Sequence, residues 1–447
     1  MITASDKLNR ELKERLERLA VCDRDYWSFK GNSRREHGHG FFQYPAMMVP
    51  QMARAILAEV CAVHPETKWV FDPFAGSGTI LTESMLMGLS FAGCDINPLA
   101  ILLCRTKAGP FFHKALADKV HSLLDRIKTD MDSQIEIDFA GRDKWFRNDV
   151  QIALSKIRRA IKYETTIWAR RFFWIALAET VRVTSNSRTS TFKLHTRPSF
   201  EIATRSLDPI EQFQRVVERN LEHLKTQSEY LNSNGYLNRG HYTKNIELSL
   251  GDTRKLESSD GKRFDIVITS PPYGDNVTTV PYGQYSYLPL QWIDPSDIDS
   301  NDITEYLRST HEIDYRSLGG SQRISEDDTS FLSERSQSFC RLLKQLSAEP
   351  PDRLKKVTAF FRDLNRCIVP ILEKLRAGGL MFWTLGNRRV AGKSIPLDAI
   401  LTEMLEHEGA VLLTRLKRRI PSKRMAIRNN IAETMRAETI LVMRKAM

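Results

Sequence analysis

Residues 68–79 read KWVFDPFAGSGT, and this stretch decides the fold class. A short apolar run predicts a β-strand, Gly76 and Gly78 predict a tight turn, and the residues from Thr79 to Gly88 predict a helix closed by that last glycine. Glycines let a ligand approach the backbone at the carboxyl end of a strand, where open α/β sheets bind their ligands. No lysine follows the glycines, and the Gly-x-Gly-x-x-Gly spacing is missing, so neither a phosphate-binding loop nor a dinucleotide site is indicated.

A second strand ends in an unusual loop, because residues 264–273 read FDIVITSPPY. Pro271 and Pro272 fix φ and lack an N–H, so the backbone is rigid and its carbonyls stay free to accept hydrogen bonds. Ser270 adds a hydroxyl and Tyr273 a flat ring. A planar substrate with an exocyclic amine could stack on the ring while its amine hydrogens point at Ser270 and the Pro271 carbonyl. Taken alone, the motif could equally be a strand-ending turn.

Together the two stretches resemble the S-adenosylmethionine-dependent amino-methyltransferases of DNA. DPFAGSGT at 72–79 resembles their cofactor motif, and TSPPY at 269–273 resembles their catalytic motif. The resemblance implies an α/β fold, a Rossmann-like class I methyltransferase sheet, with S-adenosylmethionine as cofactor and duplex DNA as partner. It implies catalytic roles for Ser270, Pro271, Pro272 and Tyr273, and cofactor binding by Asp72, Phe74, Gly76, Gly78 and Thr79. The serine form of the catalytic motif implies cytosine N4 as target, since Asp or Asn is usual for adenine N6.

Two more strand ends and one short motif could complete the cofactor site. Asp95 ends the next apolar strand, where it could accept hydrogen bonds from both ribose hydroxyls of a nucleoside. Asp252 follows a strand of alternating apolar residues and could accept from an adenine amine. Either acid alone could simply cap a turn or a helix. Tyr44-Pro45 resembles the family motif that closes over the methionine end of the cofactor, although helix initiation at Pro50 explains it equally well.

The carboxyl part carries a dense basic run. Strands are predicted over 411–416 and 439–443, as a closing hairpin with a long connection. The run has no intervening acid and is expected to contact DNA phosphates, although such runs usually form a solvated face. Its residues are Arg415, Lys417, Arg418, Arg419, Lys423, Arg424 and Arg428. The whole chain has 66 Lys and Arg against 55 Asp and Glu, a net charge of +11, which suits a polyanionic partner.

The motifs divide the chain into a catalytic domain and insertions. We predict an N-terminal helical extension over 1–39 and a catalytic domain over 40–104 and 246–447. Residues 105–245 are predicted to form a mainly helical insertion that could recognise the target. Residues 294–355, rich in Ser, Asp, Glu and Arg, are predicted to be a flexible insertion within the catalytic domain.

Several classes of chemistry and location are disfavoured. None of the six cysteines follows a proline, which argues against the thiolate attack of cytosine C5-methyltransferases, and no CxxC pair or disulfide framework is present. His37 and His39 lie on a glycine-rich stretch without further ligands, so a solvated loop is expected there and no metal site. No apolar run reaches the roughly 18 residues of a membrane span. A soluble cytoplasmic protein of a prokaryote, acting at the nucleoid, is expected.

The function that fits these motifs is methylation of cytosine N4 in duplex DNA after the base flips from the helix. Adenine N6 methylation uses the same architecture, and only Ser270 argues against it. An RNA base methyltransferase stays open, although no RNA-binding module is recognisable. A catalytically silent DNA-binding subunit is the alternative from another class, and the intact motifs argue against it. A cognate restriction or defence system could be a partner, and the sequence does not give the oligomeric state.

Overall fold

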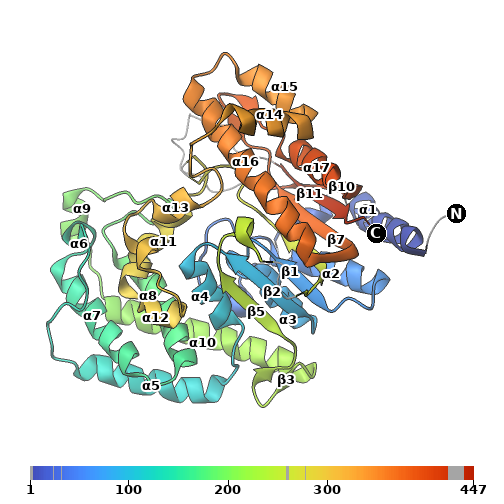
Figure 1. Cartoon of the computed structure of the whole chain (residues 1–447). Helices are drawn as coiled ribbons and strands as arrows, with labels where there is room; N and C mark the ends of the chain where they lie inside the picture. The colour runs from blue at the N-terminus through green and yellow to red at the C-terminus, as the bar shows by residue number, and fades with distance from the viewer. Residues whose placement is uncertain are drawn as a thin grey trace.

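A seven-stranded sheet organises the protein (Figure 1). The computed structural model describes residues 4–23, 25–31, 33–257, 261–276, 278–420 and 437–446. The strand order is β10-β11-β7-β6-β1-β2-β5, and only β11 runs antiparallel to its neighbours. The strands are β1 (Trp69–Asp72), β2 (Ser90–Asp95), β5 (Ile246–Leu250), β6 (Phe264–Thr269), β7 (Leu375–Leu385), β10 (Val411–Arg419) and β11 (Ala437–Arg444). The predicted α/β fold with a Rossmann-like sheet is confirmed.

Helices cover both faces of the sheet, because its strands are apolar on both sides. Along β11, Ile440 and Val442 point into one hydrophobic core, and Leu441 and Met443 point into the other. Near-continuous apolar runs of this kind are typical of parallel sheets buried on both faces. The order of the strands reverses between β1 and β6, so the chain leaves these two neighbouring strands in opposite directions along the sheet. Such a reversal is where open α/β sheets bind ligands.

The first face carries the helices nearest the predicted cofactor turn and a large helical insertion. The former are α2 (Pro50–Val63), α3 (Thr79–Leu86), α4 (Pro98–Lys107) and α11 (Tyr282–Trp292). The insertion consists mainly of α5 (His113–Thr129), α6 (Arg142–Trp145), α7 (Asn148–Tyr163), α8 (Ile167–Thr184), α9 (Ser199–Thr204) and α10 (Pro209–Ser233). Helix α8 forms its core, with Phe172, Phe173 and Trp174 all buried. Figure 1 shows these helices gathered beside the β5 edge of the sheet.

The opposite face carries α16 (Pro351–Lys374) and α17 (Leu397–His407), together with α14 (Glu326–Arg335) and α15 (Gln337–Leu346) from the segment expected to be flexible. Residues 294–355 also contain α12 (Pro295–Ile298) and α13 (Glu312–Arg316), which pack against helices of the first face. These helices were not predicted, because their serines and acids are typical of loops. Ser325 and Asp328 in fact form a capping box for α14, and Ser336 caps α15, which buries Phe339 and Leu342.

The amino-terminal region packs on the body of the protein. Helix α1 (Ala4–Cys22) buries Leu12 and Leu16, and its Asp6 lies 3.4 Å from Arg444 at the end of β11, so α1 lies beside that strand (Figure 1). The expected solvated histidine loop is wrong, since His37–Gly40 forms a 3-10 helix in which His39 is buried. Its Nε2 lies 2.8 Å from Glu83 Oε1, which gives the ring a polar partner inside the core. In the part of the chain that the structure describes, no helix is both long and apolar enough to cross a membrane.

Candidate active site

A cavity opens at the carboxyl ends of β1, β2, β5 and β6. It collects most of the residues that the sequence motifs singled out: Tyr44, Pro45, Asp72, Phe74, Gly76, Thr79, Asp95, Asp252, Ser270 and Pro272. Pro271, Tyr273 and Gly78 lie next to lining residues but are not part of the wall. A Cβ at Gly78 would lie 2.9 Å from Cys104 Sγ, so this glycine allows α3 to pack closely on α4.

The glycine turn is held by Asp95. Gly76 has φ of 48° and Gly78 φ of 69°, a left-handed backbone that favours glycine. The Gly76 amide donates to Asp95 Oδ2 at 2.7 Å, and the Asn97 amide donates to Oδ1 at 2.8 Å. Each carboxylate oxygen can accept a second hydrogen bond, so both remain available to a ligand. Burial raises the pKa of Asp95 to about 6.

A second buried acid, Asp72, joins the ends of β1 and β6. Its Oδ1 accepts from the Thr269 hydroxyl at 2.7 Å and from the Phe74 amide at 3.1 Å. Burial raises the pKa of Asp72 to about 7, and these hydrogen bonds only partly offset that effect. Among the described residues, neither Asp72 nor Asp95 has a cation within ion-pair distance, in contrast with Asp252 described below.

Two residues that the motifs did not single out shape the other end of the cavity. Asn97 caps α4 and donates its side-chain amide hydrogens to the Tyr44 hydroxyl at 2.9 Å and to Ser286 Oγ at 2.8 Å. Tyr282, on α11, stacks on the Tyr44 ring with centroids 5.8 Å apart and planes inclined at 25°. Burial raises the pKa of Tyr44 well above its usual value, so its hydroxyl stays protonated. The Asn-Pro pair after Asp95 was the available sequence signal for Asn97.

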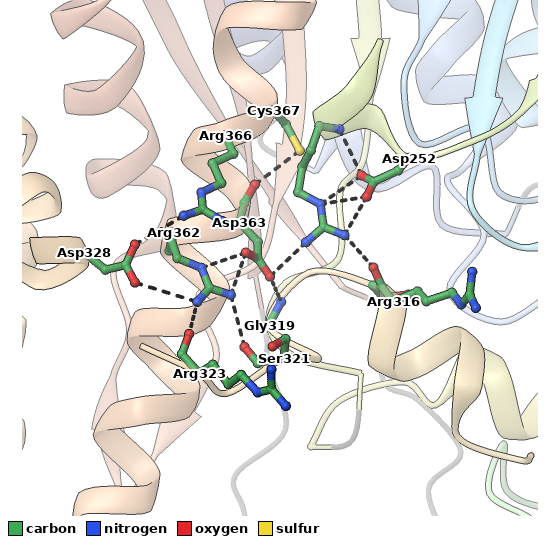
Figure 2. Close-up of polar contacts among 12 residues, drawn as sticks. Asp252, Arg316, Gly319, Ser321, Arg323, Asp328, Arg362, Asp363, Arg366 and Cys367 are labelled. Carbon is green, nitrogen blue, oxygen red and sulfur yellow. Dashed lines mark hydrogen bonds and ion pairs between the residues drawn. The ribbon is translucent and has the colours of Figure 1, made fainter. Parts of the chain in front are cut away.

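Asp252 is engaged by an arginine rather than free, as Figure 2 shows. Arg254 Nε lies 2.9 Å from Asp252 Oδ1, and its second nitrogen lies 2.6 Å from Oδ2. The same guanidinium lies 3.2 Å from Asp363 Oδ2. Asp363, fully buried on α16, also binds Arg362, whose Nε lies 2.9 Å from its Oδ1. The sequence had suggested a carboxylate open to an adenine amine, and the structure adds an ion pair on both oxygens.

This ion-pair network fixes one wall of the cavity. Arg254 donates to the Arg316 carbonyl at 2.7 Å, and the Gly319 amide donates to Asp363 at 3.0 Å. Arg362 binds the carbonyls of residues 321 and 323. Arg316, Ser317 and Leu318 line the cavity, so the network positions the segment that carries them (Figure 2). None of these contacts follows a local sequence pattern, because the partners come from the 3-10 helix Thr253–Lys255, from residues 316–323 and from α16.

The catalytic-motif loop ends in a chain of hydroxyl and carboxyl groups. Ser270 Oγ lies 3.2 Å from the Tyr273 hydroxyl oxygen, which lies 3.0 Å from Glu438 Oε1 on β11. Arg418, on β10, forms an ion pair with Glu438 Oε2. Burial raises the pKa of Tyr273 well above its usual value. The Tyr273 hydroxyl therefore points into the protein, and its ring packs against the core that contains Phe71 and Trp383.

Part of the basic run lies within strand β10, and not in the connection between two strands where it was expected. Strand β10 continues to Arg419, because the alternation of the run matches a strand, and Arg418 is only 6% exposed in its pair with Glu438. Arg418 is thus not available to DNA phosphates. Arg415, Lys417 and Arg419 alternate with it on the exposed side of the strand. Lys423, Arg424 and Arg428 lie outside the described residues.

Comparison with known proteins shows that the chain is similar to DNA and tRNA methyltransferases. A family model described as DNA methylase, covering N6 and N4 enzymes, matches residues 3–103. The type II methyltransferase M.MvaI of Kocuria varians is 32% identical over 462 aligned residues, which cover 98% of this chain and 96% of that protein. The type II methyltransferase M.MjaII of Methanocaldococcus jannaschii is 30% identical over 21% of this chain and 17% of its own length. A tRNA (guanine(10)-N2)-dimethyltransferase of Methanothermobacter thermautotrophicus is 38% identical over 18% of this chain and 22% of its own length.

Proposed function

The chain belongs to the DNA methylase family, and from that premise we propose that it transfers a methyl group from S-adenosylmethionine to the N4 amine of cytosine in duplex DNA. The observation that carries the cytosine assignment is Ser270. This residue lines the cavity at the end of β6, in the position where adenine N6 enzymes that resemble this chain usually carry Asp or Asn.

The residues that line the cavity suit S-adenosylmethionine. Asp95 would hold the ribose hydroxyls with the second lone pair of each oxygen, and the glycine turn allows the nucleoside to lie close to the backbone. Tyr44 and Pro45 would enclose the methionine end. Asp252 would accept the adenine amine while it shares its carboxylate with Arg254. When bound, the cofactor supplies an electrophilic methyl group on a positive sulfonium, which suits a cavity whose two central acids have no cation partner among the described residues.

The chain's own groups would position the target amine. A cytosine must leave the duplex to reach the cavity, since its amine is paired inside the helix. Ser270 Oγ and the Pro271 carbonyl would accept the two amine hydrogens and so direct the nitrogen lone pair toward the methyl group. Pro272, which lines the wall, would flank the base. Catalysis of this kind rests on orientation and on electrostatic help to the developing positive charge.

We propose two regions for contact with duplex DNA. Arg415, Lys417 and Arg419, on the exposed side of β10, would contact phosphates. The helical insertion over 105–245 would recognise the target sequence. This role is supported by the closeness of the insertion to the cavity. The amide of Leu194 donates to Gln284 Oε1 at 3.2 Å, and Gln284 lies on α11, the helix whose Tyr282 lines the cavity. Such an enzyme would act on the chromosome in the cytoplasm, where a restriction or defence system could accompany it.

Mass spectrometry of nucleosides from a host without other DNA methyltransferases tests the proposal. Expression of the protein should add N4-methylcytosine to the DNA, and the Ser270→Ala variant should add little or none while it binds the cofactor normally. N6-methyladenine as the sole product would support the adenine alternative. Methylated RNA nucleosides without methylated DNA would support an RNA enzyme, and cofactor-independent DNA binding without any product would support a silent subunit.

A further inference from the structure

We propose that Glu438, acting through Tyr273, orients the Ser270 hydroxyl as a hydrogen-bond acceptor for the target amine and receives the proton that the amine loses. This inference rests on the proposed function, since it concerns the amine that Ser270 would hold. The three groups form one continuous chain, with 3.2 Å between the two hydroxyl oxygens and 3.0 Å from Tyr273 to Glu438 Oε1.

The direction of the hydrogen bonds follows from counting hydrogens. An ionised carboxylate can only accept, so the single Tyr273 hydroxyl hydrogen is donated to Glu438. Tyr273 therefore has no hydrogen left for Ser270 and must accept from it. The Ser270 hydrogen is then directed into the protein. The lone pairs of Ser270 Oγ are free to face the cavity, which Ser270 lines. The carboxylate thus fixes Ser270 as an acceptor, which is the role an amine N–H requires.

The surroundings of Glu438 keep one of its oxygens for this purpose. Arg418 from β10 pairs with Oε2, which leaves Oε1 to Tyr273. Arg34, just before the 3-10 helix His37–Gly40, adds a second positive charge within electrostatic reach of Glu438. The Glu438 side chain is 12% exposed, so a proton received there can pass on to solvent. Glu438 touches neither substrate nor cofactor and is therefore a positioning residue.

The proton transfer balances without another reactant. When the methyl group leaves sulfur and the N–C bond forms, the positive charge moves from the sulfonium to the amine nitrogen, which then holds one hydrogen too many. That N–H bond breaks as the proton passes to Ser270 Oγ. The Ser270 hydrogen passes to the Tyr273 oxygen, and the Tyr273 hydrogen passes to Glu438 Oε1. The chain ends with a neutral methylated amine, two intact hydroxyls and a protonated carboxyl.

Two variants test the chain by different routes. Tyr273→Phe keeps the ring and removes the hydroxyl. The double variant Glu438→Gln with Arg418→Met removes the acid together with its charge partner, so no buried guanidinium is left unpaired. Glu403→Gln is the matched control, because Glu403 also accepts hydrogen bonds from hydroxyls, Ser338 at 2.6 Å among them, and does not line the cavity. The measurements are single-turnover methyl transfer to duplex DNA, calorimetric affinity for S-adenosylmethionine, and the melting temperature.

We expect both test variants to lower the single-turnover rate by about 100-fold, the lower range for loss of acid–base catalysis, with cofactor affinity changed less than about twofold. The Glu403→Gln control should keep the wild-type rate. A wild-type rate in Tyr273→Phe would overturn the inference while methylation itself stands. Equal reductions of rate and cofactor affinity would also overturn it, because they would indicate a purely structural role. A wild-type protein that methylates no nucleic acid would instead overturn the proposed function, and this inference with it.

Discussion

The carboxylates around the cavity fall into two groups. Asp72 and Asp95, at the ends of the central strands β1 and β2, accept hydrogen bonds only from backbone amides and a hydroxyl among the described residues. Asp252 and Glu438, after β5 and on β11, are each held by an arginine. Burial raises the pKa of the first two to about 7 and about 6, respectively. The middle of the site thus carries acids that lack a cation within the described chain, and its flanks carry acids paired with one.

This difference separates acids that await a ligand from acids that maintain the site. A buried carboxylate without a cation is costly unless something compensates its charge, and a positively charged cofactor would do so. A carboxylate paired with arginine already has its charge compensated. The arginine of Asp252 engages both oxygens, whereas the arginine of Glu438 leaves one oxygen to Tyr273. An adenine amine would therefore share the Asp252 oxygens with Arg254, whereas Tyr273 has one oxygen of Glu438 to itself.

The largest effect should come from replacing Asp363, the buried acid that pairs with Arg254 and Arg362. Asp363→Ala should lower the free energy of unfolding by about 3–5 kcal/mol, because it leaves Arg254 and Arg362 without their buried partner. Denaturant titration measures this decrease. Glu222→Ala is the control, since its pair with Lys225 spans 3.9 Å on the surface, and it should cost below about 1 kcal/mol. Equal decreases in the two variants would contradict a special role for Asp363.

The acids without an arginine partner should respond in cofactor binding. Asp95→Ala should weaken S-adenosylmethionine binding by about 1.5–3 kcal/mol, the worth of hydrogen bonds to a charged acceptor. Calorimetry measures the affinity. Glu247→Ala, an exposed acid on the neighbouring strand β5, should bind as the wild type does. Wild-type affinity in Asp95→Ala would mean that Asp95 only secures the glycine turn.

A smaller effect is expected from pH on the same carboxylate. With a pKa of about 6, Asp95 is ionised above that pH and protonated below it. Cofactor affinity should therefore fall as pH decreases, by about tenfold between pH 7 and pH 5, because the ionised acceptor becomes protonated. Asp72 titrates in a similar pH range, so the contribution of Asp95 is the difference in cofactor affinity between the wild type and Asp95→Asn at each pH. An affinity that rises toward pH 5 would contradict the assignment.

The smallest effect per residue should appear on the basic strand. Replacing Arg415, Lys417 and Arg419 by Ala should reduce the slope of log DNA affinity against log salt by about 0.9 for each phosphate that the variant no longer neutralises. Lys355→Ala, at an exposed lysine near the start of α16, should leave the slope unchanged. A wild-type slope in the triple variant would mean that the exposed side of β10 does not bind DNA.

Local motifs predicted the centre of the site, and distant segments of the chain built its flanks. The first strand, the glycine turn, the helix after it and the next strand all lie within residues 69–95, so their spacing alone predicted the turn at Gly76 and the acid at Asp95. The pairs Asp363–Arg254 and Glu438–Tyr273 join segments more than 100 residues apart, and no local pattern encodes them. Arg418 was misassigned because its partner comes from another strand. Its alternation with exposed cations was nevertheless visible in the sequence.

A crystal structure with S-adenosylhomocysteine and a duplex that contains the methylated sequence would test the proposed methylation of cytosine N4. We expect a cytosine turned out of the helix, with its N4 within about 2.7–3.2 Å of Ser270 Oγ and the Pro271 carbonyl. We also expect the cofactor ribose on Asp95. An adenine in the cavity, or a cytosine amine held by groups other than Ser270, would contradict the proposed function.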